Sequence, residues 1–301
     1  MDLTLLGSGL LGQAIGERLL QRGHRLTVWN RSPERCAPLL AVGAQAAVDP
    51  ATAVTAGDLV LTVLADGACT RSVLLEQAGT ALAGRLVLQV ATISPAESQA
   101  LEAGLHQLGG AYLETPVLGS RPEALAGRLQ VMVGGSLDAL ERARPVLDDL
   151  GPALTHLGPV GTAAHTKLAL NQLIASLTHS FSLSLHLVQA AGVEVEAFMA
   201  LLRSSALYAP TFDKKLAKEL ADDYSNPNFP TAHLRKDLQL FLAAAQAQGL
   251  EALGLEGLQR LLQRATAAGL DGLDYSALHR LTAAAPVNAT PVNPAQLDAE
   301  V

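Results

Sequence analysis

The sequence predicts an α/β fold in which a doubly wound sheet forms the N-terminal half and an all-helical domain forms the C-terminal half. Three observations predict this arrangement. Short apolar runs alternate with helical patterns up to about residue 157, no strand-like run appears from residue 161 onward, and a helical pattern of about eight turns joins the two regions. Strands that alternate with helices form βαβ units and a parallel sheet.

The predicted strands are apolar throughout, because helices cover both faces of a parallel sheet. The first strand spans residues 2–6, and a helix reaches about Arg22 after an intervening glycine turn. Further strands are expected in HRLTVWN, at 58–65, at 84–92, in GAYLETPV ending at Val117, and in LQVMVGG ending at Gly135.

The second half begins where this pattern changes, near Leu157. The stretch TAAHTKLALNQLIASLTHSFSLSLHLVQAAG has apolar residues at helical spacing, which predicts a long helix connecting two domains. Helical patterns continue to Ala285, and the last residues are rich in Pro and Asn, which is typical of a fraying end. We therefore predict domains at 1–160 and 161–285, with a flexible tail at 286–301.

Composition excludes several classes of protein. Hydrophobic residues make up 49% of the chain and charged residues 16%, which indicates a globular chain with ample core. The net charge of −7 comes without a basic run, so we expect no nucleic-acid partner. No apolar stretch approaches the roughly 18 residues of a membrane span, so no membrane association is expected. The absence of a leader before Leu3 and the two cysteines, Cys36 and Cys69, predict a cytoplasmic protein.

The turn after the first strand carries the motif LLGSGLLGQAIG, which contains GxGxxG. The motif follows a predicted strand and opens a helix, which is the context of a Rossmann-type dinucleotide site. Gly7 permits the tight turn, Gly9 lets the backbone approach a pyrophosphate, and Gly12 lets helix and strand pack closely. A pyrophosphate would lie at the electropositive helix N-terminus. A plain strand–helix turn is the alternative.

The end of the second strand, TVWNRSPER, indicates which dinucleotide is bound. An acidic residue at this place would favour NAD by accepting hydrogen bonds from a free ribose hydroxyl. Here Arg31 offers a planar fork suited to a phosphate, and Asn30 and Ser32 are neutral donors beside it. We therefore predict NADP(H) as the cofactor. The alternative is that Arg31 is a solvated loop arginine.

Lys167 is a candidate proton donor near the start of the long helix. Hydride transfer to a carbonyl places negative charge on its oxygen, which a positioned acid must neutralise. Asn171 follows four residues later, so both side chains leave one helix face. The helix start, and burial to a greater extent, would lower the pKa of this lysine. Taken alone, the spacing favours the alternative, a surface lysine on an amphipathic helix.

Three further segments, ETPVLGSRPEALAGRLQVMVGG, GPVGTAAHTKLALNQL and FPTAHLRKDLQL, stand in this order behind the glycine turn. With it they resemble the β-hydroxyacid dehydrogenase family, which includes 3-hydroxyisobutyrate dehydrogenases, from residue 1 to about 284. The segments TVWNRS, VLGSRPEALAGRL, ALYAPTFDKK and GLDGLDYSAL are most similar to its glyoxylate/succinic semialdehyde reductase branch, which uses NADPH.

The resemblance implies roles for single residues. It implies that Lys167 is the general acid or base, that Asn171 and Phe229 bind substrate, and that Lys236 reaches the nicotinamide. Thr92 matches a position beside the nicotinamide ribose. The predicted cofactor-binding residues are Gly7, Ser8, Gly9, Leu10, Leu11, Gly12, Asn30, Arg31, Ser32, Leu64, Ala65, Asp66, Thr92 and Lys236.

The chain departs from the family at Leu118, where a serine usually helps to hold the substrate carboxylate. We expect backbone amides at Gly119 and Ser120 to bind the carboxylate instead, with Ser120 as the substitute donor, while Leu118 narrows and dries the pocket. The loss of one charge-assisted hydrogen bond is worth roughly 1.5–3 kcal/mol, so this change puts the substrate in doubt more than the reaction.

The predicted function is NADPH-dependent reduction of a small aldehyde that bears a carboxylate, such as glyoxylate or succinic semialdehyde, to the hydroxy acid. Oxidation of a 3-hydroxyisobutyrate-type acid, imine reduction and a non-catalytic oligomeric scaffold are the alternatives. Leucine and alanine cover more than one face of the C-terminal helices, which predicts a partner surface. The family resemblance implies that this partner is a second copy of the chain, in a homodimer or homotetramer. The histidines lack further ligand partners, so no metal is expected.

Overall fold

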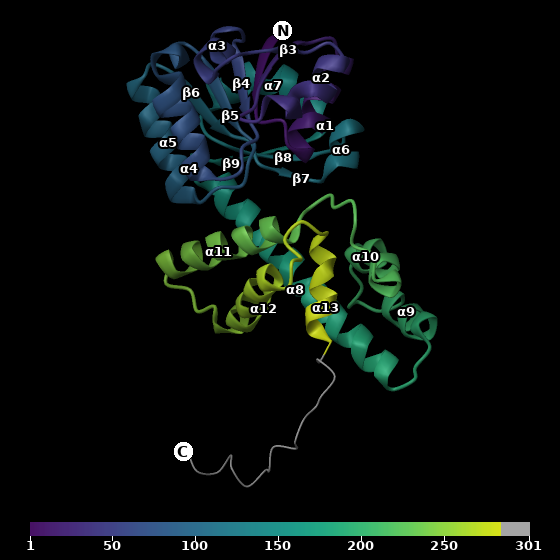
Figure 1. The fold of residues 1–301 in the computed structure, drawn as a ribbon. Helices are drawn as coiled ribbons and strands as arrows, with labels where there is room; N and C mark the ends of the chain where they lie inside the picture. The colour runs from purple at the N-terminus through teal and green to yellow at the C-terminus, as the bar shows by residue number, and fades with distance from the viewer. Residues whose placement is uncertain (284–301) are drawn as a thin grey trace.

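The computed structural model describes residues 1–283, which form a sheet-containing half and a helical half (Figure 1). The long helix α8 (Thr162–Ala190) leaves the sheet and runs through the helical half. The predicted boundary at residue 160 falls between the last strand and this helix, and the predicted tail at 286–301 lies outside the described residues.

The sheet has the strand order β3-β2-β1-β4-β5-β6-β8-β7, and β9 pairs with β8. Neighbours from β3 to β6 are parallel. The order reverses between β1 and β4, and such a switch point opens a ligand crevice at the carboxyl ends of the strands. The strands are β1 (Asp2–Leu6), β2 (Arg25–Trp29), β3 (Gln45–Ala46), β4 (Leu59–Thr62), β5 (Leu86–Gln89), β6 (Ala111–Glu114), β7 (Val117–Leu118), β8 (Gln130–Gly134) and β9 (Ala153–Gly158).

The sheet differs from the fully parallel arrangement that the apolar runs predict. β8 is antiparallel to both β6 and β7. The expected strand in GAYLETPV divides at Thr115 and Pro116 into β6 and β7, and β9 is a strand that the apolar pattern does not predict. β9 has no fully buried residue, so it lacks the apolar run by which a buried strand is found.

Helices cover both faces of the sheet, which explains why β4 and β5 are buried along their whole length. On one face, α1 and α7 pack over side chains such as Leu5 and Leu61, and on the other, α3 and α5 pack over Val60 and Val87. The helices are α1 (Leu10–Gln21), α2 (Ala37–Ala41), α3 (Pro50–Thr55), α4 (Gly67–Arg71), α5 (Pro95–Gln107), α6 (Arg121–Leu125) and α7 (Leu137–Leu150).

The helical half is built around α8, which packs against α11 and α13. Leu234, Leu238 and Leu262 form the main core beside α8, and Phe181 stacks on Phe212 in a second cluster. No helix among the described residues combines the length and the hydropathy that a membrane span requires. The other helices are α9 (Val195–Arg203), α10 (Pro210–Ala221), α11 (Thr231–Ala247), α12 (Glu256–Ala267) and α13 (Leu278–Thr282).

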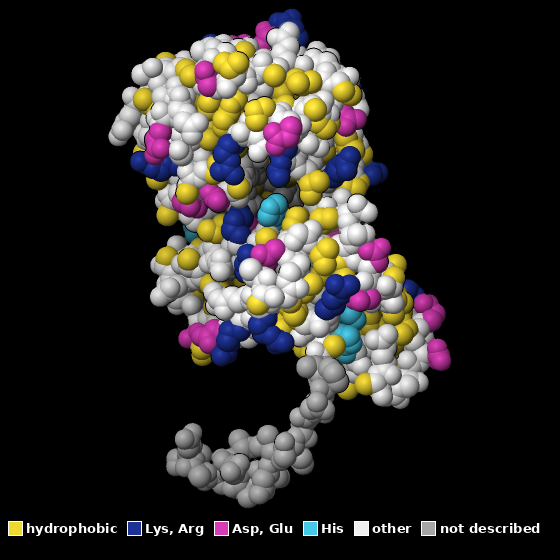
Figure 2. Space-filling model, viewed as in Figure 1, with side chains coloured by type: hydrophobic (Ala, Val, Ile, Leu, Met, Phe, Trp, Pro, Cys, Tyr) yellow, Lys and Arg dark blue, Asp and Glu magenta, His cyan; other side chains and the backbone are white. Residues whose placement is uncertain are grey.

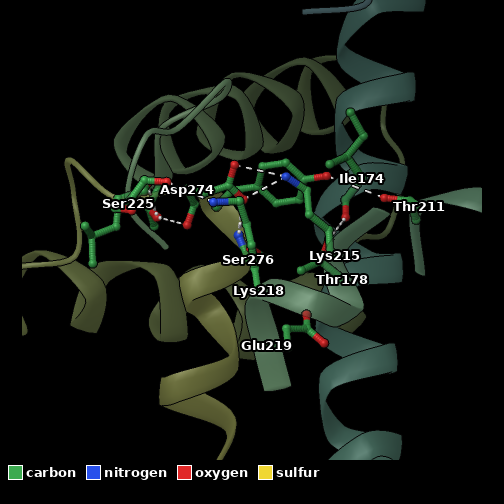
Figure 3. A network of polar contacts seen from close by, with 12 residues as sticks. Ile174, Thr178, Thr211, Lys215, Lys218, Glu219, Ser225, Asp274 and Ser276 are labelled. Carbon is green, nitrogen blue, oxygen red and sulfur yellow. Dashed lines mark hydrogen bonds and ion pairs between the residues drawn. The ribbon is translucent and has the colours of Figure 1, made fainter. Parts of the chain in front are cut away.

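A buried polar network ties α10 to the turn that precedes α13 (Figure 3). The Lys215 ammonium donates to both carboxylate oxygens of Asp274, at 2.8 and 3.0 Å, and lies over the ring of Tyr275. The carboxylate of Asp274 also accepts from the amide and hydroxyl of Ser276. Because Asp274 is fully buried, these donors compensate for the loss of its hydration and fix the turn.

Candidate active site

The glycine turn leaves open space at the N-terminus of α1. Gly7 has a φ of +103°, and a Cβ at Gly7 or at Gly12 would collide with the carbonyl oxygen of Val63 or of Gly7 respectively. A Cβ at Gly9 would meet nothing within 4 Å, and no side chain caps α1. The first amides of α1 therefore lack a side-chain cap, and the motif predicts that they bind a pyrophosphate. Leu10 and Leu11, which follow Gly9, begin α1 itself.

Asn30 fixes this turn from the end of β2. Its Oδ1 accepts from the amide of Ser8 at 3.1 Å, and its Nδ2 donates to the carbonyl of Ser32 at 2.9 Å. The Ser8 hydroxyl lies 3.7 Å from the buried thiol of Cys36. The sequence predicts that Asn30 is a neutral donor beside Arg31 at the cofactor site. In the structure its amide group shapes the nucleotide turn.

Arg31 is exposed immediately after β2, beside the glycine turn. Within residues 1–283 its guanidinium has neither a hydrogen-bond acceptor nor an ion-pair partner. It therefore remains available to a phosphate near the adenosine ribose. Figure 2 shows Lys and Arg side chains, interspersed with Asp and Glu, along the border between the two halves.

Lys167 lies one turn inside α8 and is only 9% exposed. Burial lowers the pKa of its ammonium to about 8; the negative charge of Asp237 opposes this change and the positive charge of Lys236 adds to it. Lys167 faces a small pocket of about 10 Å³ at the carboxyl ends of β5 and β6. The other lining residues are Gln89, Ala91, Thr92, Ile93, Ser98, Glu114, Pro116 and Ala164.

Asn171 and Lys236 join this site to α11. The Asn171 Nδ2 donates to the Oδ2 of buried Asp237 at 2.5 Å. The Lys236 ammonium donates to the carbonyl of Thr92 at 2.6 Å, across the two halves, and lies 3.0 Å from the Asp237 Oδ1. The structure thus brings Lys167 and Asn171 of α8 together with Lys236 and Thr92, which come from distant parts of the sequence.

Asp237 is a site residue that the sequence analysis missed. A signal was available, because Asp237 lies between Leu234 and Leu238 on the buried face of α11, where a carboxylate is rare. A charged residue on an apolar helix face needs a partner, and Asn171 and Lys236 supply it.

Residues 64–66 follow β4, next to β1 in the sheet. Leu64 is half-buried, whereas Ala65 and Asp66 are exposed at the carboxyl edge. The Asp66 carboxylate caps α4 by accepting from the amide of Cys69 at 2.7 Å. This segment therefore borders the predicted dinucleotide crevice, with the Asp66 side chain engaged in its own helix.

Leu118, Gly119 and Ser120 lie at the end of β7 and the start of α6. Gly119 has a φ of +125°, which strongly favours glycine. The amide and the hydroxyl of Ser120 both donate to the Glu123 Oε2 at 2.8 Å. The sequence predicts Ser120 as the substitute carboxylate donor. Its two donors are instead taken by a capping box, because Glu123 stands three residues later at the helix start.

Phe229 is predicted to bind substrate, whereas His165, two residues before Lys167, is not a predicted site residue. Phe229 precedes α11 and packs its ring against Tyr275, at 5.8 Å between centroids, and against the main core of the helical half. His165 is exposed and its Nδ1 lies 2.7 Å from the carbonyl oxygen of Gly161, which separates it from the Lys167 pocket. Across residues 1–283 no cluster of three His, Cys, Asp or Glu side chains has the arrangement of a metal site.

Two family models together match almost all of the described chain. The family model described as the NAD binding domain of 6-phosphogluconate dehydrogenase matches residues 2–158. The model described as NAD-binding of NADP-dependent 3-hydroxyisobutyrate dehydrogenase matches residues 161–282.

Individual proteins and solved structures of the same family are also similar to this chain. Glyoxylate/succinic semialdehyde reductase 1 of Arabidopsis thaliana is 30% identical over 246 residues, covering 81% of this chain and 85% of the relative. The NAD-dependent L-serine dehydrogenase of Pseudomonas aeruginosa is 31% identical, covering 82% and 86%. The structure of Mycobacterium tuberculosis 3-hydroxyisobutyrate dehydrogenase with L-serine is 25% identical, with a TM-score of 0.85 over 94% of this chain and 100% of the other. The chain belongs to the β-hydroxyacid dehydrogenase family of nicotinamide-dependent oxidoreductases that act on CH–OH groups.

Proposed function

We propose that this protein reduces a small carboxylate-bearing aldehyde of the glyoxylate or succinic semialdehyde type to the hydroxy acid, with NADPH as reductant and Lys167 as general acid. The observation that carries the proposal is the buried Lys167 ammonium at the carboxyl edge of the sheet, with a pKa lowered to about 8. An acid whose pKa lies near neutral pH transfers a proton efficiently in both directions.

The dinucleotide fits the residues at the switch point. The open space at Gly9 and the free first amides of α1 suit the pyrophosphate, and residues 64–66 and Thr92 border the crevice. Exposed Arg31, which has no partner within residues 1–283, supports a 2′-phosphate and so NADP(H) rather than NAD(H). The bound nicotinamide would supply the hydride, while the protein supplies orientation and a proton.

Lys167 would donate its proton to the carbonyl oxygen as negative charge develops there. Lys236, held on the carbonyl of Thr92, adds a second positive charge near the pocket. Asn171 is oriented by Asp237, and its Oδ1 has no partner within residues 1–283, so it is free to accept from a hydroxyl of the product.

A 3-hydroxyisobutyrate-type acid is the second candidate substrate, oxidised in the reverse direction. The observation that favours it is the similarity of the whole fold to the Mycobacterium tuberculosis enzyme. Leu118 bears on both candidates, because it removes a hydroxyl that would hold the substrate carboxylate, at a cost of roughly 1.5–3 kcal/mol in binding.

A substrate panel tests the proposal. Oxidation of NADPH is followed with glyoxylate, succinic semialdehyde and a cyclic imine, and reduction of NADP⁺ and NAD⁺ with 3-hydroxyisobutyrate. We expect the acidic aldehydes to turn over and Lys167→Ala to keep NADPH binding while losing most turnover. Turnover of the imine alone would replace the proposal with imine reduction. Cofactor binding without turnover of any carbonyl would favour a scaffold.

We also propose three properties of the protein as a whole: the domain limits at 1–160 and 161–285, a cytoplasmic location, and a homodimer or homotetramer. Exposed Leu173, Leu183 and Leu187 on α8 support association, since solvated leucines on a long helix favour a partner surface. Light scattering after gel filtration gives the oligomeric mass, and a monomer at micromolar concentration would contradict the last prediction.

A further inference from the structure

Glu114 is a buried carboxylate that the proposed reaction does not use. It ends β6, is 1% exposed and lines the same pocket as Lys167. Its Oε2 accepts from the amides of Ala163 and Ala164, at 3.1 and 3.4 Å. Its Oε1 has no partner within the described residues. Burial of a carboxylate costs free energy unless hydrogen bonds or an opposite charge compensate for its lost hydration.

These two hydrogen bonds join the sheet to the first turn of α8. A helix start leaves four amides without partners inside the helix, and no side chain of α8 or of Gly161 caps them. The carboxylate from β6 takes this place across 49 residues of sequence. Negative charge is also favourable at the positive end of the helix dipole. Glu114 therefore fixes both the position and the depth of the start of α8.

The anchored amides lie directly behind the lysine. Ala163 and Ala164 precede Lys167 by four and three residues, so all three share one helix face. The Lys167 Cα is only about 4.5–6 Å further along the helix axis, at 1.5 Å per residue. A shift at the anchor would therefore be transmitted to the lysine with little attenuation.

The backbone of β8 is shaped around the carboxylate. Gly134 pairs with Glu114 in the sheet, and a Cβ at Gly134 would collide with the Glu114 Oε2. The position of the Glu114 carboxylate thus requires a glycine at 134 on the neighbouring strand. Burial raises the pKa of the Glu114 carboxyl, although the nearby Ser98 hydroxyl and the α8 amides oppose the increase.

We propose that Glu114 is a positioning residue, which holds the first turn of α8 against the sheet so that the Lys167 amine is kept buried and directed at the reacting carbonyl. This inference rests on the proposed function of Lys167. It assigns to Glu114 no contact with substrate or cofactor. In this role the burial of Lys167 depends on the Glu114 anchor.

Glu114→Ala and Glu114→Gln test the proposal in the full-length protein. Alanine removes both acceptors, and we expect kcat to fall roughly tenfold to a hundredfold, the range that a small misplacement of a catalytic group produces. Glutamine keeps the size and one carbonyl oxygen, so we expect it to restore most of kcat. Affinity for NADPH and the KM for the aldehyde should change little. Gln99→Ala is the matched control, because exposed Gln99 donates to the carbonyl of Val160 just before α8 and lies outside the anchor.

The pKa of Lys167 is the decisive readout. Looser packing admits water to the ammonium, so in Glu114→Ala we expect this pKa to rise from about 8 towards 10.5. The pKa is measured by the pH dependence of reductive methylation of Lys167 with formaldehyde, followed by peptide mass spectrometry, and this readout needs no turnover. An effect of the Glu114 charge alone would lower the pKa instead. Gly134→Ala, which displaces the carboxylate without changing Glu114, should raise it as Glu114→Ala does.

The outcomes separate the two proposals. Parental kcat in Glu114→Ala, or a Lys167 pKa that is unchanged or lower, would overturn the positioning role. If no carbonyl is reduced by any variant, the proposed function fails while the labelling midpoint still decides the role of Glu114. If Glu114→Ala does not fold, Gly134→Ala and the glutamine variant provide the same comparison, with circular dichroism and NADPH binding as evidence of folding.

Discussion

Replacing Lys167 by Met should abolish most turnover and at the same time stabilise the protein. The ammonium is 9% exposed, and burial lowers its pKa from 10.5 to about 8. At about 1.36 kcal/mol per pKa unit, this change corresponds to roughly 3 kcal/mol by which the folded state disfavours the charged form. Met has nearly the same length and no charge, so it removes this penalty. Loss of a general acid lowers kcat by roughly 10²–10⁴.

The gain in stability should depend on pH in a defined way. Below about pH 8 the amine is charged in both the folded and the unfolded state, so the whole penalty is present. Between about pH 8 and 10.5 the unfolded chain binds the proton and the folded protein does not, so the stability of the parent rises with pH. The advantage of Lys167→Met should therefore be largest at pH 7 and small near pH 10.

Urea unfolding at pH 7 and pH 9.5 measures the effect, with equal protein concentrations because association adds to apparent stability. Lys214→Met is the matched control, since Lys214 is exposed on α10, and we expect it to change the free energy of unfolding by no more than about 0.5 kcal/mol. A Lys167→Met protein that is less stable than the parent at pH 7, or equally affected at both pH values, would refute the argument that Lys167 is held at the cost of stability.

Three further predictions follow from the same contacts. In the direction of reduction, kcat should decline above about pH 8 as the Lys167 ammonium loses its proton, and a flat profile to pH 10 would place the acid elsewhere. Arg31→Ala should weaken NADPH binding by about tenfold or more and leave NADH nearly unchanged, as measured by fluorescence titration; equal losses would remove the argument for NADP. Burial raises the pKa of the Glu219 carboxyl to about 7, so the parent loses stability as pH rises from about 4.5 through 7. Glu219→Gln should therefore be more stable than the parent at pH 8, by up to about 3 kcal/mol, and similar to it near pH 4.5, and a difference that does not vary with pH would contradict this reasoning.

Local patterns are sufficient for much of the fold. The strand predicted at 2–6 and the long helix predicted from Thr162 agree with β1 and α8, because both depend on the periodicity of apolar side chains within one element. The GxGxxG turn can also be predicted from the sequence, because backbone carbonyl groups lie too close to Gly7 and Gly12 for any other residue to fit. The separation of Lys167 and Asn171 by four residues is enough to place both side chains on one face of α8, where both are buried.

Only the tertiary structure decided which groups from different elements meet. β9 has no run of buried apolar residues, and it is held by its pairing with β8. The spacing of apolar residues within β9 does not reveal this pairing. Ser120 resembles a free donor in the sequence, but its hydroxyl is engaged by Glu123, and Asp237 acquires a role only through Asn171 on another helix. The sequence by itself determined the elements, the dinucleotide turn and the candidate lysine. Folding determined the burial that lowers the pKa of Lys167, because desolvation depends on neighbours contributed by distant parts of the chain.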